Sequence, residues 1–432
     1  MGKRLVFITT RLFWPPDSGR KNSLYHYCKG LHKQLGYEVY VYAFPEGDQS
    51  TSDAEEHPDF IEDVQVATPI TASTKARNLV SAVFCPFAPF QCALYWSKTN
   101  RNRIRAYCNE VEPEVVVIDM IRLAPYSKAL EGLGCATVLD YDDLLSKRYE
   151  RQMDEGGNVL GKYDTQASGF VRTLSSNRFI KRALLSLESK RVRRAEDNFA
   201  RAADAVLFVS PLEAEELDNR LGTIKCFDAT LGAEVPDLPN CIPEQTYDLG
   251  FVGNMHAAAN QASLDFICSE VLPLLPGRTL RVIGVCPDDI VHRYEQSSQI
   301  SFSGRVESIE DELLKCKIML APFAYGTGIK TKVLEAMGMG VPVVTNSTGI
   351  EGMTCRPGTD LLVGESAQEL ADCCNVLFED SEKRSEVGKV GREYVQRCHD
   401  WHTSIERLGH CLDFALMSNS FLNEGTNNEK SH

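Results

Sequence analysis

The residues best placed to do chemistry lie in a loop and the helix after it, within residues 321–345, which read APFAYGTGIKTKVLEAMGMGVPVVT. Gly328 allows the backbone to come close to a ligand. The pattern predicts a helix over about 330–337. Free amides at the start of such a helix bind anions, and Lys330 and Lys332 add positive charge there. A diphosphate is therefore the expected ligand of this loop.

Glu335 lies one turn further along the predicted helix, roughly above Thr331. A carboxylate at this place accepts two hydrogen bonds from a vicinal diol, such as the ribose of a nucleotide. For the loop taken alone, the alternative interpretation is an ordinary turn with a solvated glutamate and two surface lysines.

Both halves of the chain repeat a pattern of strand, turn and helix, which predicts two doubly wound, Rossmann-like α/β domains. The strand candidates are apolar without alternation, as expected of parallel strands that are covered on both faces. A proline-rich stretch, LGAEVPDLPNCIPEQTYD, places the boundary near residue 245. A ligand is expected at the carboxyl ends of the strands, in a cleft between the domains. The predicted strands are residues 5–9, 38–44, 114–119, 136–141 and 205–210 in the first half, and 248–254, 280–284, 300–304, 318–323 and 342–347 in the second.

The composition favours a folded chain of two domains. A length of 432 residues is too long for one ordinary core, and 43% apolar with 25% charged residues is the balance of a globular protein. A net charge of −14 argues against general nucleic-acid binding, which needs a positive field. The 15 cysteines are scattered, so we interpret them as reduced residues of a cytoplasmic protein without a structural zinc site.

Two segments raise the question of a membrane. Residues 79–96 carry no charge and are about long enough to cross a bilayer, but Pro86 and Pro89 interrupt them, which favours a buried or interfacial segment. Residues 178–201 hold eight Lys or Arg against three acidic residues. A basic amphipathic helix can lie on an anionic membrane, and a solvated helix with ion pairs is the alternative.

Two further clusters lie at predicted strand ends. Gly19, in the loop at 15–20, is expected to approach a phosphate or an acceptor, with a tight packing turn as the alternative. The stretch LDYDDLL places Asp140, Asp142 and Asp143 after a strand. One of these carboxylates could orient an acceptor hydroxyl or take its proton, and helix capping is the alternative. Asp119 is a weaker candidate on the same logic.

Taken together, these motifs resemble those of the GT-B glycosyltransferases, specifically those like family 4, and most closely the bacterial polysaccharide-type sugar transferases. LEAMGMGVPVVT after a glycine-bearing loop is similar to the donor-site signature of that family. The resemblance extends over nearly the whole chain. It is carried by residues 15–42, 209–217, 251–273 and 302–323 as well.

The resemblance implies that Glu335 binds ribose as the second of two glutamates spaced by seven residues. The first would fall at Thr327 and is absent. The Arg and Lys with which the family grips the diphosphate align with Asn254 and about Asn260, so those charges are missing too. We expect Arg305 and the two lysines of the loop to supply the charge instead.

The sequence therefore predicts a metal-independent hexosyltransferase that needs no cofactor and moves a sugar from a nucleotide-diphosphate donor to a glycan, lipid-linked or protein hydroxyl. Retention of configuration and a role in polysaccharide biosynthesis, at the inner face of the membrane, are implied by the resemblance. A non-catalytic binding subunit and a sugar-nucleotide epimerase remain alternatives. The predicted domains are 1–245 for the acceptor and 246–395 for the donor, with a C-terminal helix at 396–418 that packs back on the first domain and a disordered tail at 419–432. The predicted catalytic residues are Asp140, Asp142 and Lys330, and the predicted donor-binding residues are Gly19, Gly253, Asn254, Arg305, Gly328, Ile329, Lys330, Thr331, Lys332 and Glu335.

Overall fold

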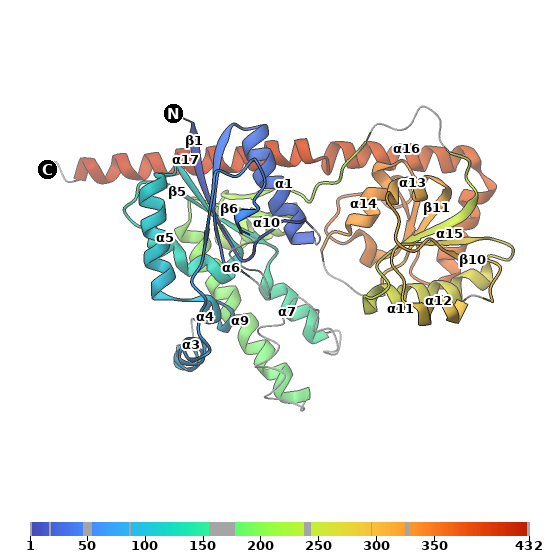
Figure 1. The fold of residues 1–432 in the computed structure, drawn as a ribbon, viewed down its shortest axis with the longest axis horizontal. Helices are drawn as coiled ribbons and strands as arrows, with labels where there is room; N and C mark the ends of the chain where they lie inside the picture. Colours follow the sequence, from blue (N-terminus) through green and yellow to red (C-terminus); the bar gives the residue numbers. More distant parts are fainter. Residues whose placement is uncertain are drawn as a thin grey trace. The chain divides into compact units, whose positions relative to one another are not determined.

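The chain forms two compact units, each with its own parallel sheet (Figure 1). The structure is a computed structural model, which describes residues 2–16, 19–45, 54–85, 88–154, 178–236, 243–294, 296–324 and 328–429. The first unit comprises Met1–Thr230 together with Ile405–His432, and the second comprises Leu231–Ser404. The units thus divide at residue 230, ahead of the boundary that the sequence predicts near residue 245. Leu231 and Ala233 already bond to His399 of the second unit.

The first unit is built on a seven-stranded parallel sheet in the order β3-β2-β1-β4-β5-β6-β7. All five residues of β4 are buried, as are the last five of β1, because helices cover both faces of the sheet. The strands are β1 (Lys3–Thr9), β2 (Tyr37–Ala43), β3 (Asp63–Val66), β4 (Val115–Asp119), β5 (Ala136–Asp142), β6 (Ala205–Phe208) and β7 (Cys226–Asp228). The helices are α1 (Gly19–Lys33), α3 (Ala72–Phe84), α4 (Phe90–Tyr95), α5 (Lys98–Val111), α6 (Met120–Leu123), η1 (Ala124–Ala129), α7 (Leu145–Asp154), α9 (Arg178–Ala202) and α10 (Pro211–Leu221).

The second unit repeats the scheme with six parallel strands in the order β10-β9-β8-β11-β12-β13. Its strands are β8 (Tyr247–Val252), β9 (Leu280–Ile283), β10 (Ile300–Phe302), β11 (Cys316–Ala321), β12 (Val343–Thr345) and β13 (Leu362–Val363). Its helices are α11 (Ala258–Phe266), η3 (Ile267–Val271), η4 (Leu272–Leu274), α12 (Asp288–Tyr294), α13 (Ile309–Leu314), α14 (Thr331–Gly338), η5 (Ser347–Ile350), α15 (Ala367–Glu379) and α16 (Ser381–Cys398). The predicted doubly wound α/β fold is thus confirmed.

Three strands that the sequence pattern does not predict, β3, β7 and β13, each lie at one edge of a sheet. They contain two to four residues, and those of β3 and β7 are only half-buried. An edge strand has one paired side and needs no long apolar run, so its sequence signal is weak.

The C-terminal helix predicted over 396–418 is interrupted near its start. The chain forms α16, a break, and then α17 (Trp401–Glu429). At the break the amide of Ala233 donates to the carbonyl of His399 at 2.7 Å, and Ala233 pairs with Asp400. The buried imidazole of His399 donates from Nδ1 to the carbonyl of Leu231 at 3.1 Å. These bonds use backbone groups that a continuous helix would need.

Beyond the break, α17 packs on the first unit. Arg407 forms an ion pair with Asp228 at 2.6 Å, and the rings of Phe414 and Phe227 are 5.1 Å apart. In the segment 419–432, for which the sequence predicts a disordered tail, α17 continues to Glu429; residues 430–432 lie outside the described part. A helix that is already formed adds polar residues at little cost.

The uncharged segment 79–96 is divided between two helices, α3 and α4. In α4, Gln91, Cys92 and Leu94 are buried, whereas α3 buries only Ala82. Residues 86 and 87 lie outside the described part. Across the described residues, no helix is both long and apolar enough to cross a bilayer.

Candidate functional site

The switch point of the second sheet lies between β8 and β11. β8 continues to β9 and β10 on one side, whereas β11 pairs with β8 on the other side and continues to β12 and β13. In doubly wound sheets, ligands bind beyond the carboxyl ends of the strands at this point. The loops that follow β8 and β11 contain Gly253 and Gly328, so the sheet brings these two predicted donor residues to one edge.

Lys330 is fixed at the start of α14 by contacts from three directions. Its Nζ donates to the carbonyl of Gly328 at 2.6 Å, lies 3.7 Å from a carboxylate oxygen of Glu351, and lies 5.8 Å from the ring centroid of Phe323. Lys330 is also the residue that caps α14, with an extended backbone. The ammonium group is therefore held beside the first amides of the helix, where the positive end of the helix dipole lies.

The loop before α14 is anchored by Asn346, which follows β12. The amide of Phe323 donates to Oδ1 of Asn346 at 3.1 Å, and Nδ2 of Asn346 donates to the carbonyl of Phe323 at 2.9 Å. The hydroxyl of Ser263 in α11 accepts from the amide of Ala324 at 3.4 Å. These contacts fix the carboxyl end of β11. Sequence reasoning missed Asn346, which directly follows β12, and Glu351, which follows the short helix η5.

Gly328 has φ = 75°, the left-handed region that a glycine adopts without strain. Ile329 is half-buried, and its Cγ1 would lie 3.1 Å from a Cβ added to Gly352. Thr331 is the first residue of α14 and is half-buried. Thr327, where the resemblance places an absent glutamate, lies outside the described residues.

Lys332 and Glu335 follow in α14 and interact with each other electrostatically. Desolvation lowers the pKa of Lys332, and the charge of Glu335 opposes that shift. Desolvation raises the pKa of Glu335, Lys332 opposes the shift, and Glu310 adds to it. Glu335 is exposed and Lys332 is half-buried, so a ligand that approaches from solvent can reach both charges.

Gly253 and Asn254 form a tight turn after β8. The amide of Gly253 donates to the carbonyl of Ile283 at 2.9 Å, and Oδ1 of Asn254 accepts from the amide of His256 at 3.0 Å. A Cβ added to Gly253 would lie 2.6 Å from Cε of Met255, so a larger residue there would require the methionine side chain to move. The turn leads into α11, so the start of a second helix lies at the same edge.

Among the predicted residues of the second unit, Arg305 is the one that follows an edge strand. It follows β10 and is exposed, and β10 is separated from β11 by β9 and β8. Three strand spacings correspond to about 14 Å between the backbones of β10 and β11. Only the long side chain of Arg305 could cover part of that distance.

The first unit contains a buried ionic cluster at its own switch point, between β1 and β4. We name it the Arg20 cluster: Arg20 with Asp119, Asp140 and Asp142. Nη2 of Arg20 lies 2.6 Å from Asp119 and 2.7 Å from Asp140, and Nη1 lies 3.2 Å from Asp142. The amide of Thr10 donates to Asp119 at 2.8 Å. Sequence reasoning missed Arg20, because nothing local marks an arginine in a first helix turn as buried.

The predicted catalytic residues Asp140 and Asp142 differ in their surroundings. Asp140 is fully buried, and its pKa is raised to about 6 by burial, which the charge of Arg20 opposes. Asp142 retains 22% exposure of its side chain, and burial raises its pKa against the effect of Arg20. Burial also acts on Asp119, but Arg20, Arg11 and Thr10 outweigh it and lower the pKa of Asp119. Of the three carboxylates, Asp142 alone has appreciable access to solvent.

The neighbouring Asp143 and Gly19 have different places. Asp143 accepts from Nε of Arg148 at 2.9 Å, an ion pair within the start of α7. Gly19 is the first residue of α1, and a Cβ added to it would meet nothing within 4 Å. Residues 17 and 18 of the same loop lie outside the described part.

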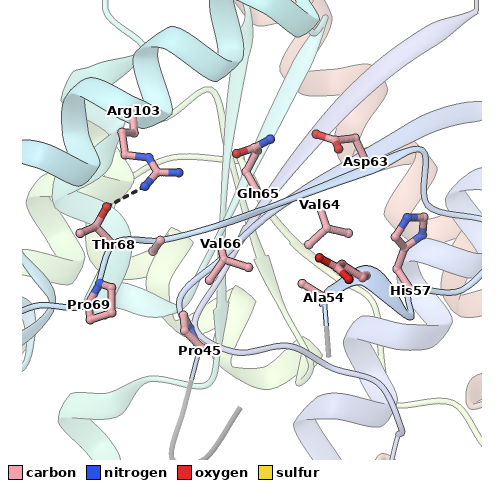
Figure 2. A pocket seen from close by; sticks show the side chains of 12 residues that line it. Pro45, Ala54, His57, Asp63, Val64, Gln65, Val66, Thr68, Pro69 and Arg103 are labelled. Atoms are coloured by element: carbon pink, nitrogen blue, oxygen red, sulfur yellow. Dashed lines mark hydrogen bonds between the residues drawn. The ribbon is translucent and has the colours of Figure 1, made fainter. Parts of the chain in front are cut away.

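A cavity of about 820 Å³ lies elsewhere in the first unit, beside the edge strand β3 (Figure 2). Its polar wall includes Arg103, which donates to Thr68 at 2.7 Å, and Asp63, which accepts from Tyr107 at 2.9 Å. None of the predicted site residues lines it. Among the residues that the structure describes, no three His, Cys, Asp or Glu side chains are grouped to hold a metal ion.

Comparison with known proteins finds a likeness in the second unit. Residues 246–380 match the family model of the Glycosyl transferases group 1. The match lies within the second unit. A GDP-mannose-dependent monoacylated alpha-(1-6)-phosphatidylinositol monomannoside mannosyltransferase of Corynebacterium glutamicum is 30% identical over 170 residues, which are 35% of this chain and 43% of that protein. The match to this curated relative thus spans less than half of its length.

Solved structures extend the likeness of fold to nearly the whole chain. HepE of Anabaena, in complex with UDP, matches with a TM-score of 0.63 and 14% identity, over 95% of this chain and 99% of that one. The sucrose-phosphate synthase of Thermosynechococcus elongatus matches with a TM-score of 0.61 and 14% identity, over 94% and 98%. The fold of the chain is GT-B.

Proposed function

We propose that this chain is a glycosyltransferase that moves a hexose from a nucleotide-diphosphate donor to a hydroxyl acceptor. The observation that carries the proposal is the arrangement at the start of α14: Lys330 held beside the helix amides, with Glu335 one turn further, inside the segment that matches the group 1 family. A pyrophosphate fits the cationic end of the helix, and a ribose diol fits the carboxylate.

Some of the donor-binding residues would supply charge, and others would form the surface that contacts the nucleotide. Lys330, Lys332 and the first amides of α14 would stabilise the negative charge that develops on the leaving diphosphate. Arg305 would add positive charge from the loop that follows the edge strand β10. Gly253, Asn254, Gly328, Ile329 and Thr331 would form the surface on which the nucleotide lies. One relative is GDP-mannose-dependent and another was solved in complex with UDP, so GDP and UDP are the first nucleotides to test.

For the acceptor we assign the predicted catalytic aspartates different roles. Asp142, the more exposed carboxylate of the Arg20 cluster, would orient the acceptor hydroxyl. Asp140 is buried and bonded to Arg20, so it would act as a positioning residue. Retention of configuration without a bound metal follows from the family resemblance, with the diphosphate handling much of the proton transfer. Gly19 would lie near the donor or the acceptor.

The acceptor class, the pathway and the location are part of the same proposal. We favour a glycan, a lipid-linked saccharide or a protein as acceptor, in glycan or polysaccharide biosynthesis on the cytoplasmic side of a membrane. The first unit would bind the acceptor and the second the donor.

The direct test measures nucleotide binding and sugar transfer in matched variants of the full chain. Thermal shift with UDP, GDP and their sugar conjugates identifies the donor, because a ligand that binds only the folded state raises the Tm. We expect Lys330→Ala and Glu335→Gln to lose at least about tenfold in donor affinity, which corresponds to one strong charged contact. Lys389→Ala, at an exposed position of α16, serves as the control for removal of a lysine.

The outcomes separate the candidates. If Lys330→Ala keeps full donor affinity and activity, the assignment of the diphosphate site is wrong. Asn254 stands where the family has a positive residue, and this departure favours one alternative, a non-catalytic binding subunit. That alternative predicts nucleotide binding by calorimetry without turnover, even with a cell extract as acceptor source. An epimerase would release free sugar with no need for an acceptor.

A further inference from the structure

We propose that the exposed faces of α3 and of the N-terminal half of α9 form one docking surface for an anionic lipid bilayer. Both helices belong to the first unit, where they project away from the seven-stranded sheet (Figure 1). We name this region the α3–α9 surface. It consists of Lys75, Arg77, Val80, Val83, Phe84, Arg182, Leu187, Lys190, Arg193 and Arg194. The inference is independent of the donor site and stands or falls separately from it.

The face of α3 that points to solvent is apolar. Val80 is 60% exposed, Val83 55% and Phe84 83%. Residues three and four apart share one face of a helix, so Val80 lies beside both Val83 and Phe84. The only residue that α3 buries is Ala82. An apolar face of this kind costs free energy in water and is typical of an interaction site.

α9 holds the C-terminal end of α3 in place. Nη1 of Arg191 donates to the carbonyl of Ala82 at 3.1 Å, and the guanidinium lies 4.7 Å from the ring centroid of Phe90. Glu188, also buried, accepts from the amide of Gln91 at 3.1 Å. The apolar end of α3 and the middle of α9 are therefore neighbours. Leu187, 44% exposed, lies one turn before Arg191 and extends the apolar surface onto α9.

The exposed side of α9 next to this surface is basic. Arg182, Lys190, Arg193 and Arg194 are exposed, and α3 adds the exposed Arg77 and the half-buried Lys75. Within α3 and residues 182 and 184–194, Glu188 is the single acidic side chain described, and it is buried. The side chains of 178–181 and 183 lie outside the described part. This local positive charge stands in a chain whose net charge is −14.

The combination of apolar side chains with flanking basic groups matches an anionic lipid surface. Valine and phenylalanine side chains insert at the boundary between headgroups and acyl chains, and lysine and arginine pair with the headgroups. A second copy of this chain fits less well, because a two-fold interface would set the same basic groups against each other. With no described helix suited to crossing a bilayer, the surface would lie on the membrane.

The test is co-sedimentation of the full chain with phosphatidylcholine vesicles that either contain or lack phosphatidylserine. We expect binding only to the vesicles with phosphatidylserine, and loss of that binding in about 1 M salt, where the Debye length falls to about 3 Å. Phe84→Ser and the double variant Lys190→Glu/Arg193→Glu should each reduce the vesicle partition coefficient at least about tenfold. Ile224→Ser is the matched apolar control, because Ile224 is also 83% exposed in the first unit. Lys389→Glu is the charge control.

Several results would overturn the proposal. These are equal binding to both kinds of vesicle, no binding to either, or an equal loss of binding in Ile224→Ser and Phe84→Ser. Light scattering that shows a dimer in the wild type and a monomer in Phe84→Ser would assign the surface to self-association instead. Thermal shift with UDP and GDP should be unchanged in all these variants. Failure of the donor proposal would therefore be seen in a separate measurement.

Discussion

Removal of Arg20 is the most demanding test of how the first unit is built. Its guanidinium contacts three carboxylates, of which Asp119 and Asp140 are at most 1% exposed and Asp142 22%. Arg20→Met keeps much of the side-chain volume and removes the charge. Breaking a buried pair by removing one partner costs about 3–5 kcal/mol, because the remaining charge is left uncompensated. With an m-value of about 3 kcal/mol/M, the urea midpoint should fall by about 1–2 M.

The stability lost in Arg20→Met should depend on pH, and the pKa of Asp140 determines the direction of that dependence. That pKa is raised to about 6, so the folded state prefers the protonated carboxyl below this pH. Loss of Arg20 raises the pKa further, so the deficit of Arg20→Met should shrink as the pH falls from 7 to 5. Adding Asp140→Asn should recover part of the stability at pH 7, because it removes one of the uncompensated charges.

The assay is urea denaturation followed by tryptophan fluorescence, since Trp14 and Trp96 both lie in the first unit. Lys33→Met, in the same helix α1, is the control. Its ion pair with Asp59 is exposed on both sides, so it should change stability by less than about 1 kcal/mol. If Arg20→Met loses no more stability than Lys33→Met, and the loss does not depend on pH, the inference that the Arg20 cluster stabilises the first unit is wrong.

Three further substitutions have defined outcomes. Burial raises the pKa of Glu196 to about 7, although Ser146 donates a hydrogen bond to it at 2.6 Å. The folded state therefore favours the protonated carboxyl, so the contribution of Glu196 to stability is complete below pH ~4.5 and is lost as the pH rises to ~7. The excess of the urea midpoint of Glu196→Gln over that of the wild type should therefore grow between pH ~4.5 and ~7 and level off above pH 7. Burial, with a smaller effect of a nearby lysine, lowers the pKa of His26 to about 4, so the wild type should lose stability as the pH falls from ~6.5 towards 4. The same measurement on His26→Gln should give a flatter profile over that range. Gly232→Ala places a Cβ 2.2 Å from the ring of Trp401 and should cost about 1–3 kcal/mol, seen as a lower Tm of the second unit, and an unchanged Tm would contradict the packing described here.

The sequence predicted those parts of the fold that a local pattern encodes. The central strands of both sheets are apolar along their length because they are buried on both faces, as β4 shows with all five residues buried. The loop and helix around Lys330 were also predicted, since a glycine, two lysines and a glutamate stand within eight residues. The short edge strands, by contrast, carry too little burial to leave a pattern.

The ionic contacts could not be predicted, because they join residues far apart in the chain. Arg20 reaches partners 99, 120 and 122 positions away, and no spacing rule links them. Glu351 approaches Lys330 only because β12 lies beside β11 in the sheet. The break at His399 likewise depends on Leu231 and Ala233, which arrive from the other end of the second unit. Such contacts are consequences of topology.

α17 packs on the first unit but is synthesised after the second unit. The first unit joins segments that are far apart in the chain: Gly30 of α1 leaves room for Ile405, and Gly409 of α17 leaves room for Leu35. Residues 231–404 of the second unit must therefore be synthesised before α17 can cover the last apolar surface of the first unit. The 174 residues of the second unit are consecutive, so all the segments that pack together in it are synthesised before α17 is complete.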